Sequence, residues 1–143
     1  MKRGTGWILL IGVLAFQMSV SVPALAQQRP EDLAIQSSSA WLALNDSGKY
    51  GDSYDQTAQL FKKGVTRDQW QRSIHAERDE LGRVLSRAPK SANYTKSLPG
   101  APVGDYVVIQ YASSFEHKQS AIEIVTFLLD VDGKYRVSGY SIK

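Results

Sequence analysis

The chain of 143 residues contains no cysteine. Disulfide bonds, cysteine-ligated zinc, a thiolate nucleophile and a lipid anchor on cysteine are therefore excluded. A strong excess of one charge is missing as well. Without Lys2 and Arg3, which belong to the N-terminal segment considered below, the 17 basic residues fall to 15, against 14 acidic ones. Binding to nucleic acid by phosphate neutralisation needs a basic stripe, so we expect no nucleic-acid partner.

Motifs that carry chemistry are also scarce. The two histidines, His75 and His117, form neither an HExxH motif nor a His-x-His pair, so we expect no metal site. No serine lies in a Gly-x-Ser-x-Gly elbow, and no glycine-rich phosphate loop is present. We therefore predict no catalytic residue and no cofactor from motifs.

The first 26 residues have the pattern of a secretory signal peptide. Lys2 and Arg3 precede an uncharged, mostly apolar segment over residues 7–22, and Ala24-Leu25-Ala26 follows Pro23. This small-x-small pattern predicts cleavage after Ala26, hence a periplasmic or secreted protein with no stable membrane anchor. An uncleaved anchor is the alternative, but the apolar segment is short for a hydrocarbon core of about 30 Å.

Residues 27–143 have the length of a single domain. The first half of this segment has the pattern of helices. Pro30 suits the first turn of a helix that stops near Gly48. Asp52 or Ser53 can cap a second helix ending at Gly64. A third helix follows a capping box, and its apolar stripe carries four residues. The box is Thr66 with Gln69, and the stripe is Trp70, Ile74, Leu81 and Leu85.

From about Ser91 the apolar residues recur at every second position, which indicates strands. The expected strands are Ser91–Leu98, Asp105–Phe115, Ala121–Leu129 and Lys134–Ile142, joined by a turn-rich segment at 98–104 and a polar loop at 116–119. Helices followed by an antiparallel meander predict an α+β fold. We expect the N-terminal helices to pack on one face of a C-terminal antiparallel sheet of about four strands.

The last turn sets the register of the final hairpin. A type I turn from Asp130 with Gly133 as the left-handed residue pairs Leu129 with Tyr135 and Phe127 with Val137. The same register places Val125 opposite Gly139 and Ile124 opposite Tyr140. A two-residue turn at Asp132-Gly133 would mix apolar and polar residues on both faces, so we prefer the first register.

Several segments resemble domain-of-unknown-function family 4019, a family of secreted bacterial proteins. The segments that carry the resemblance are Leu98–Phe115, Glu123–Thr126, Asp132–Tyr140, Ala40–Leu42, Gly48–Tyr50, Trp70 and Arg78–Gly82. The run Pro-Gly-Ala-Pro-x-Gly-Asp-Tyr is the most specific piece, and Tyr135 departs from an expected tryptophan. The resemblance implies an envelope protein similar in shape to cone-like NTF2 or cystatin-like folds, and it supplies no catalytic residue.

Two sets of side chains are candidates for a binding site. Glu123 falls on the core face of its strand, and Arg78 or Glu77 falls near the core stripe of the third helix, so a carboxylate and a guanidinium could line a pocket mouth. If the sheet is curved, aromatic side chains could line a cavity for a small apolar ligand. These aromatic residues are Trp41, Trp70, Tyr111 and Phe115. A filled core and an edge ion pair are the competing interpretations.

The leading functional hypothesis is an exported, non-enzymatic domain that binds a small apolar ligand or a protein partner in the cell envelope. The first alternative is a small cone-fold enzyme of the isomerase or cyclase type, which requires a buried acid or base in a cavity. The second is a structural or assembly protein that pairs through the free sheet face or an edge strand.

Overall fold

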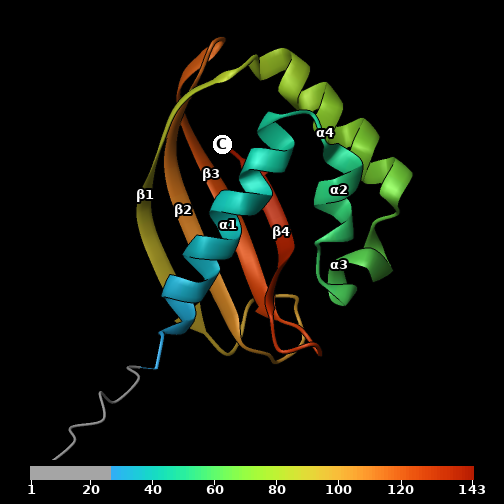
Figure 1. The fold of residues 1–143 in the computed structure, drawn as a ribbon, viewed down its shortest axis with the longest axis vertical. Coiled ribbons are helices and arrows are strands. Elements are labelled where there is room, and N and C mark those ends of the chain that lie inside the picture. Colours follow the sequence, from blue (N-terminus) through green and yellow to red (C-terminus); the bar gives the residue numbers. More distant parts are fainter. Residues whose placement is uncertain (1–26) are drawn as a thin grey trace, which may run out of the picture.

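The computed structural model describes residues 27–143, which form four helices on one face of a four-stranded antiparallel sheet (Figure 1). The elements are α1 (Pro30–Asp46), α2 (Tyr50–Asp55), α3 (Gln59–Gly64), α4 (Arg67–Leu81), β1 (Val84–Thr95), β2 (Tyr106–Phe115), β3 (Lys118–Leu129) and β4 (Tyr135–Ile142). The strands form a meander in the order β1-β2-β3-β4. The α+β prediction is confirmed, and the predicted signal peptide over residues 1–26 lies outside the described residues.

Helix α1 lies across the sheet, and its ends follow from its sequence. Pro30 occupies the first turn, where its missing N–H costs no hydrogen bond, and Glu31 and Asp32 complement the helix dipole there. Gly48 ends the segment with φ +72°, a left-handed conformation that glycine adopts without strain. Among residues 27–143, no helix is both long and apolar enough to cross a bilayer.

The predicted second helix is two short helices, so this prediction is wrong. The chain leaves helical geometry at Thr57 and Ala58 because both contact the edge strand β4. Thr57 forms a parallel bridge with Val137, and the Ala58 N–H donates to the Val137 carbonyl at 2.7 Å. Helix α2 begins at Tyr50 without a side-chain cap, rather than at a cap formed by Asp52 or Ser53.

The boundary between α4 and β1 also differs from the prediction. The capping box of Thr66 and Gln69 starts α4 as expected, but Gly82 ends it with φ +73°. Leu85 is therefore in β1 and 60% exposed, not on the helix stripe. Strand β1 begins at Val84 instead of Ser91 and tolerates Pro89 because it is an edge strand. Likewise β3 begins at Lys118, three residues before the predicted start.

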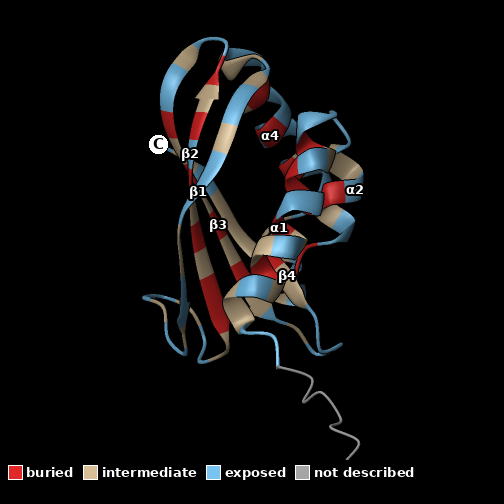
Figure 2. Ribbon diagram, turned by 60° about the vertical axis from the view of Figure 1, so that its left-hand side comes forward, coloured by how far each residue is buried: buried red, intermediate tan, exposed pale blue. Residues whose placement is uncertain are grey.

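The core lies between the sheet and the helices. In Figure 2 buried and less buried residues alternate along the central strands, as expected when one face of a sheet is covered. The buried apolar side chains come from both layers. They include Trp41, Leu42, Trp70, Ile74, Val107, Ile109, Val125, Phe127 and Val137.

The β3–β4 hairpin confirms the predicted turn and corrects the register beyond it. Gly133 has φ +75° and its N–H donates to the Asp130 carbonyl, while Phe127 pairs with Val137. Leu129, the last residue before the turn, is 39% exposed rather than buried. Past Val137 a bulge shifts the pairing by one residue, so Val125 faces Tyr140 instead of Gly139. This shift moves Tyr140 from the outer face, opposite Ile124, to the core face.

Replacing Trp70 by alanine tests the packing of α4 on this core. Trp70 is 7% exposed, lies 5.8 Å from the Trp41 ring and donates its indole N–H to the Tyr50 carbonyl. We expect Trp70→Ala to lower the free energy of unfolding by roughly 3–5 kcal/mol in urea titrations. The exposed Arg72 on the same helix is the control, and Arg72→Ala should change it by no more than about 0.5 kcal/mol. A loss below about 1 kcal/mol for Trp70→Ala would contradict the packing.

Candidate functional site

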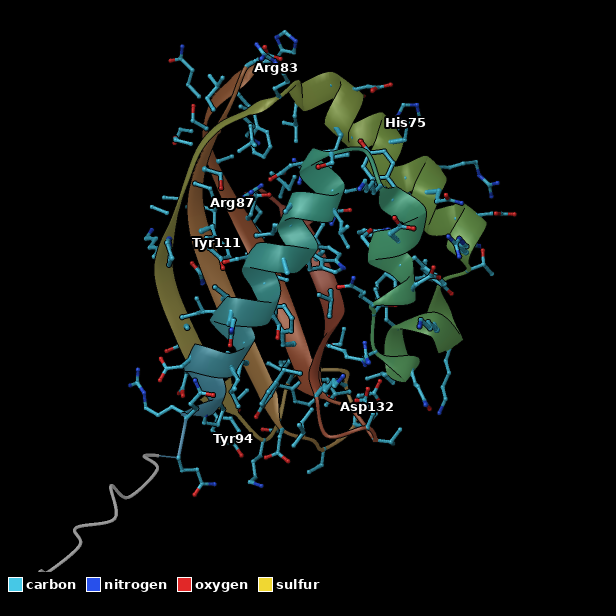
Figure 3. The ribbon with its side chains drawn as sticks, viewed as in Figure 1. His75, Arg83, Arg87, Tyr94, Tyr111 and Asp132 are labelled. Atoms are coloured by element: carbon cyan, nitrogen blue, oxygen red, sulfur yellow. The ribbon has the colours of Figure 1, made fainter. Side chains whose placement is uncertain are left out.

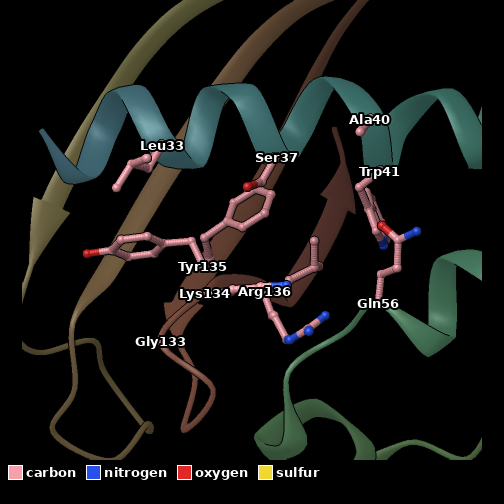
Figure 4. Close-up of a pocket in the computed structure, with 11 residues that line it drawn as sticks. Leu33, Ser37, Ala40, Trp41, Gln56, Gly133, Lys134, Tyr135 and Arg136 are labelled. Atoms are coloured by element: carbon pink, nitrogen blue, oxygen red, sulfur yellow. The ribbon is translucent and has the colours of Figure 1, made fainter. Parts of the chain in front are cut away.

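A groove of about 440 Å³ runs between α1 and the first half of β4 (Figure 4). We call it the α1–β4 groove. Its apolar lining is Leu33, Ala40, Trp41, Phe127 and Val137, and its uncharged polar lining includes Ser37 and Gln56. Figure 4 shows Leu33, Ser37 and Ala40 on the helix side, with Tyr135 and Arg136 on the strand side. The volume lies within the range of small-molecule sites, and the lining combines apolar side chains with four polar ones.

The charged residues that line the α1–β4 groove are both basic. They are Lys134, which is exposed, and Arg136. The Arg136 guanidinium donates to Asp132, and this hydrogen bond raises the pKa of Arg136. Because Arg136 is already paired, Lys134 is the cation of the lining that is available to an anionic group on a ligand.

Beside the helix layer, six polar side chains meet, and one of them is the fully buried Glu123. We call them the Glu123 cluster. Its members come from six elements, and Arg87 is labelled in Figure 3. They are Asp46 of α1, Arg78 of α4, Arg87 of β1, Ser113 of β2, Glu123 of β3 and Tyr140 of β4.

Arg87 joins the two carboxylates of the cluster. Its Nε donates to Glu123 Oε2 at 2.5 Å and its Nη2 donates to Oε1 at 3.0 Å. The same guanidinium donates to both carboxylate oxygens of Asp46, at 2.7 and 3.0 Å. Burial alone would lower the pKa of Arg87, but these hydrogen bonds outweigh burial and raise it. Arg87 is therefore a permanent cation that holds β1, β3 and the end of α1 together.

The remaining donors saturate Glu123. Ser113 Oγ donates to Oε2 at 2.5 Å and the Tyr140 hydroxyl donates to Oε1 at 2.7 Å. Burial would raise the pKa of Glu123, but the hydrogen bonds from Arg87, Ser113 and Tyr140 outweigh burial, and the pKa is lowered. Burial and the nearby charge of Glu123 raise the pKa of Tyr140, so its hydroxyl stays protonated and donates. Each carboxylate oxygen of Glu123 thus accepts two hydrogen bonds, which leaves no lone pair for a proton from a ligand.

Arg78 completes the cluster from α4. Its guanidinium donates to Asp46 at 3.0 Å and to the Tyr140 hydroxyl at 3.1 Å, and it lies 3.5 Å from Glu123. The guanidinium carbon also lies 5.3 Å from the centre of the Phe115 ring. The buried Nε has no hydrogen-bond partner in the described part of the chain. Arg78 and Asp46 border a second hollow of about 270 Å³, where they balance each other in charge.

The six residues singled out from sequence are all buried, but they lie in different places. Trp41 lines the α1–β4 groove and Trp70 packs against its ring. Arg78, Phe115 and Glu123 meet at the cluster, as the sequence suggested for the charged pair. Tyr111 donates to Ser38 of α1 at 2.9 Å, between the sheet and the helix.

Sequence reasoning missed Arg87, Asp46, Ser113 and Tyr140. The predicted first strand begins at Ser91, after Arg87. The predicted register places Tyr140 on the outer face, because the local sequence gives no signal for the bulge other than Gly139. Ser113 offered a signal: it alternates with Tyr111 and Phe115 and therefore shares their face of β2. The histidines are elsewhere: the His75 side chain is 65% exposed, and His117 is exposed. Within residues 27–143, no group of three His, Asp or Glu side chains is placed to hold a metal ion.

Comparison with known proteins gives one family. Residues 37–140 match the family described as a protein of unknown function, DUF4019. The matched segment includes most of α1, all of the other helices and three whole strands, and it ends within β4. No curated protein and no solved structure matches the chain.

The Glu123 cluster predicts how stability depends on pH. Because the folded pKa of Glu123 lies below its ordinary value of 4.5, its contribution is present above pH 4.5 and is lost as the pH falls through the lowered pKa. We expect Glu123→Gln to lower the free energy of unfolding at pH 7 by roughly 3–5 kcal/mol, because Arg87 loses a buried partner. The variant should also show a flatter stability profile below pH 4.5.

Chemical denaturation between pH 3 and pH 7 measures both effects. Glu80→Gln, at an exposed position on α4, is the matched control and should follow the profile of the unmodified protein. If Glu123→Gln and Glu80→Gln gave the same profile, the cluster would have no part in the acid sensitivity.

Proposed function

Because the chain belongs to the DUF4019 family, whose function is not known, its role has to be inferred from its own residues. We propose that it is a non-enzymatic binding protein of the cell envelope that holds a small, mostly apolar molecule with an acidic group in the α1–β4 groove. The observation that carries the proposal is an apolar groove of about 440 Å³ whose charged lining residues are Lys134 and Arg136.

The chemistry of the groove favours an amphipathic acid. Leu33, Ala40 and Trp41 offer apolar surface along α1, which suits a hydrocarbon or aromatic body. Lys134 lies on the strand side, where an ammonium can pair with a carboxylate or sulfonate near solvent. Such an exposed pair contributes little affinity, on the order of 1 kcal/mol or less, so the apolar body supplies most of the binding energy.

The Glu123 cluster supports binding rather than catalysis. An isomerase or cyclase of the cone-fold type needs a buried acid or base with a lone pair or proton directed at its substrate. Glu123 is fully buried, but its two oxygens already accept from Arg87, Ser113 and Tyr140. Its lowered pKa also makes it a weak base. Enzymatic activity is therefore the less supported alternative.

Location and shape belong to the same proposal. The signal-peptide pattern of residues 1–26 supports export to the periplasm or beyond, with cleavage after Ala26. The position of α1 across one face of the antiparallel sheet supports a cone of the NTF2-like or cystatin-like type (Figure 1). In such a cone the helix and the sheet enclose the ligand between them.

Filling the groove from α1 tests the proposal. Ala40 is exposed and lines the groove, so Ala40→Phe should occupy it without disturbing the core. We expect the affinity for decanoate, followed by displacement of the fluorescent probe anilinonaphthalene sulfonate, to fall at least tenfold. Ala43→Phe is the matched control, because Ala43 is exposed on the same helix and is not part of the lining. Equal affinities for the two variants would overturn the proposed site.

The acidic group of the proposed ligand has a separate test. Lys134→Glu should weaken decanoate binding several-fold by charge repulsion, while decanol binding changes little. Lys63→Glu, at an exposed position on α3, controls for the change in net charge. If Lys134→Glu weakened both ligands equally, the groove would bind the hydrocarbon alone.

A further inference from the structure

The face of the sheet turned away from the helices has an unusual composition. In Figure 2 the helices of residues 27–143 lie on one side of the strands, and none of them lies over the opposite side, which we call the outer face. The pairing places its residues in four rows. The rows are Thr95-Tyr106-Leu128-Arg136, Asn93-Val108-Thr126-Gly139, Ser91-Gln110-Ile124-Ser141 and Ala88-Ala112-Ile122.

Charged side chains are almost missing from the outer face. Arg136 stands at one corner of the rows, on the edge strand that also borders the α1–β4 groove, and Lys143 follows β4 at the other end. Lys90 lies at the bulge of the edge strand β1, between two of the rows. All other positions in the four rows are uncharged, in a chain with 22% charged residues. A sheet face in contact with water usually carries interspersed lysine and glutamate. This composition indicates a surface that is covered.

The centre of the outer face carries aliphatic side chains. Val108, Ile122 and Ile124 are half-buried on the two central strands, and Thr126 lies between them. Gly139 of β4 pairs with Thr126 and adds no side chain beside it. At one end the loop before β2 folds over the face, where the Tyr106 hydroxyl donates to the Pro102 carbonyl. The face therefore offers a largely uncharged surface with an aliphatic centre to a second chain.

We propose that a second copy of this chain covers the outer face, so that two sheets pack face to face about a two-fold axis. An uncharged face is complementary to itself, because no like charges meet when it is doubled, whereas a charged partner would find no ion pairs there. With four strands about 4.8 Å apart and four rows about 6.6 Å apart, the face measures roughly 500 Å² in projection. This area is of the same order as the roughly 800 Å² that each partner buries in a standard interface.

The edges of the sheet are less suited to assembly. At β4 the Ala58 N–H already occupies the Val137 carbonyl, and Thr57 bridges the same residue. At β1 the strand contains Pro89 and Lys90, both of which protect an edge from pairing with another chain. Assembly through the face is therefore favoured over extension of the sheet.

Sedimentation velocity and native mass spectrometry from 1 to 200 µM test the dimer. Gln110 is half-buried in a central row, and its side chain forms no hydrogen bond with the other residues that the structure describes, so Gln110→Lys adds a charge to the interface with little effect on the fold. We expect a dimer for the unmodified protein and at least a hundredfold weaker association for Gln110→Lys, because a lysine would be buried without a partner. Ile124→Lys should behave in the same way.

Val131→Lys is the control, because Val131 is exposed and lies in the turn between β3 and β4, beyond the four rows. It should dimerise like the unmodified protein, and thermal unfolding of every variant checks that it is folded. A monomer at 200 µM for the unmodified protein would overturn the proposal, as would a dimer that Gln110→Lys leaves intact. The α1–β4 groove lies on the helix side, so decanoate binding by Gln110→Lys reports on the proposed function separately.

Discussion

The contact between Arg87 and Glu123 links every strand of the sheet to the helices. Arg87 reaches Asp46 at the end of α1, and Glu123 accepts hydrogen bonds from Ser113 of β2 and Tyr140 of β4. Arg78 adds α4 through the same two acceptor groups, Asp46 and the Tyr140 hydroxyl. Six elements thus converge on one buried carboxylate. Two cations and two anions balance there, so the interior holds charge without a net excess.

Such a cluster fixes orientation more than it adds net stability. A buried ion pair loses most of its Coulomb energy to desolvation, but removing one partner leaves the other uncompensated. The hydrogen bonds also have to meet in one geometry, which only one placement of α1 and α4 on the sheet allows. The bulge after Val137 is part of this geometry, since without it Tyr140 would be on the outer face. Both arginines also lie at the C-terminal end of α1, where cations are favoured by the helix dipole.

The parts that sequence predicted were those controlled by local rules. The capping box of Thr66 and Gln69, the glycine turn at Gly133 and the alternation in β2 each depend on neighbouring residues alone. The α+β class and the pairing of Phe127 with Val137 followed from them. The parts that sequence missed depend on distant contacts: the break at Thr57 needs β4, the early start of β1 needs β2, and the bulge at Ser138 lets Tyr140 meet Glu123. Local periodicity places Glu123 and Arg78 near the core and so predicts that they meet. The positions of Arg87 and Asp46 in the cluster depend on distant contacts, which local periodicity does not show.

The cluster and the groove are connected through the elements they share. Asp46 ends the helix that forms one side of the α1–β4 groove, and Tyr140 belongs to the strand that forms the other side. When Arg87, Arg78 and Glu123 hold these two residues, they also hold the two sides of the groove at a fixed separation. A groove that is ordered before its ligand arrives loses less entropy on binding. The saturation that makes Glu123 unsuitable as a base is therefore the same property that supports the proposed binding role.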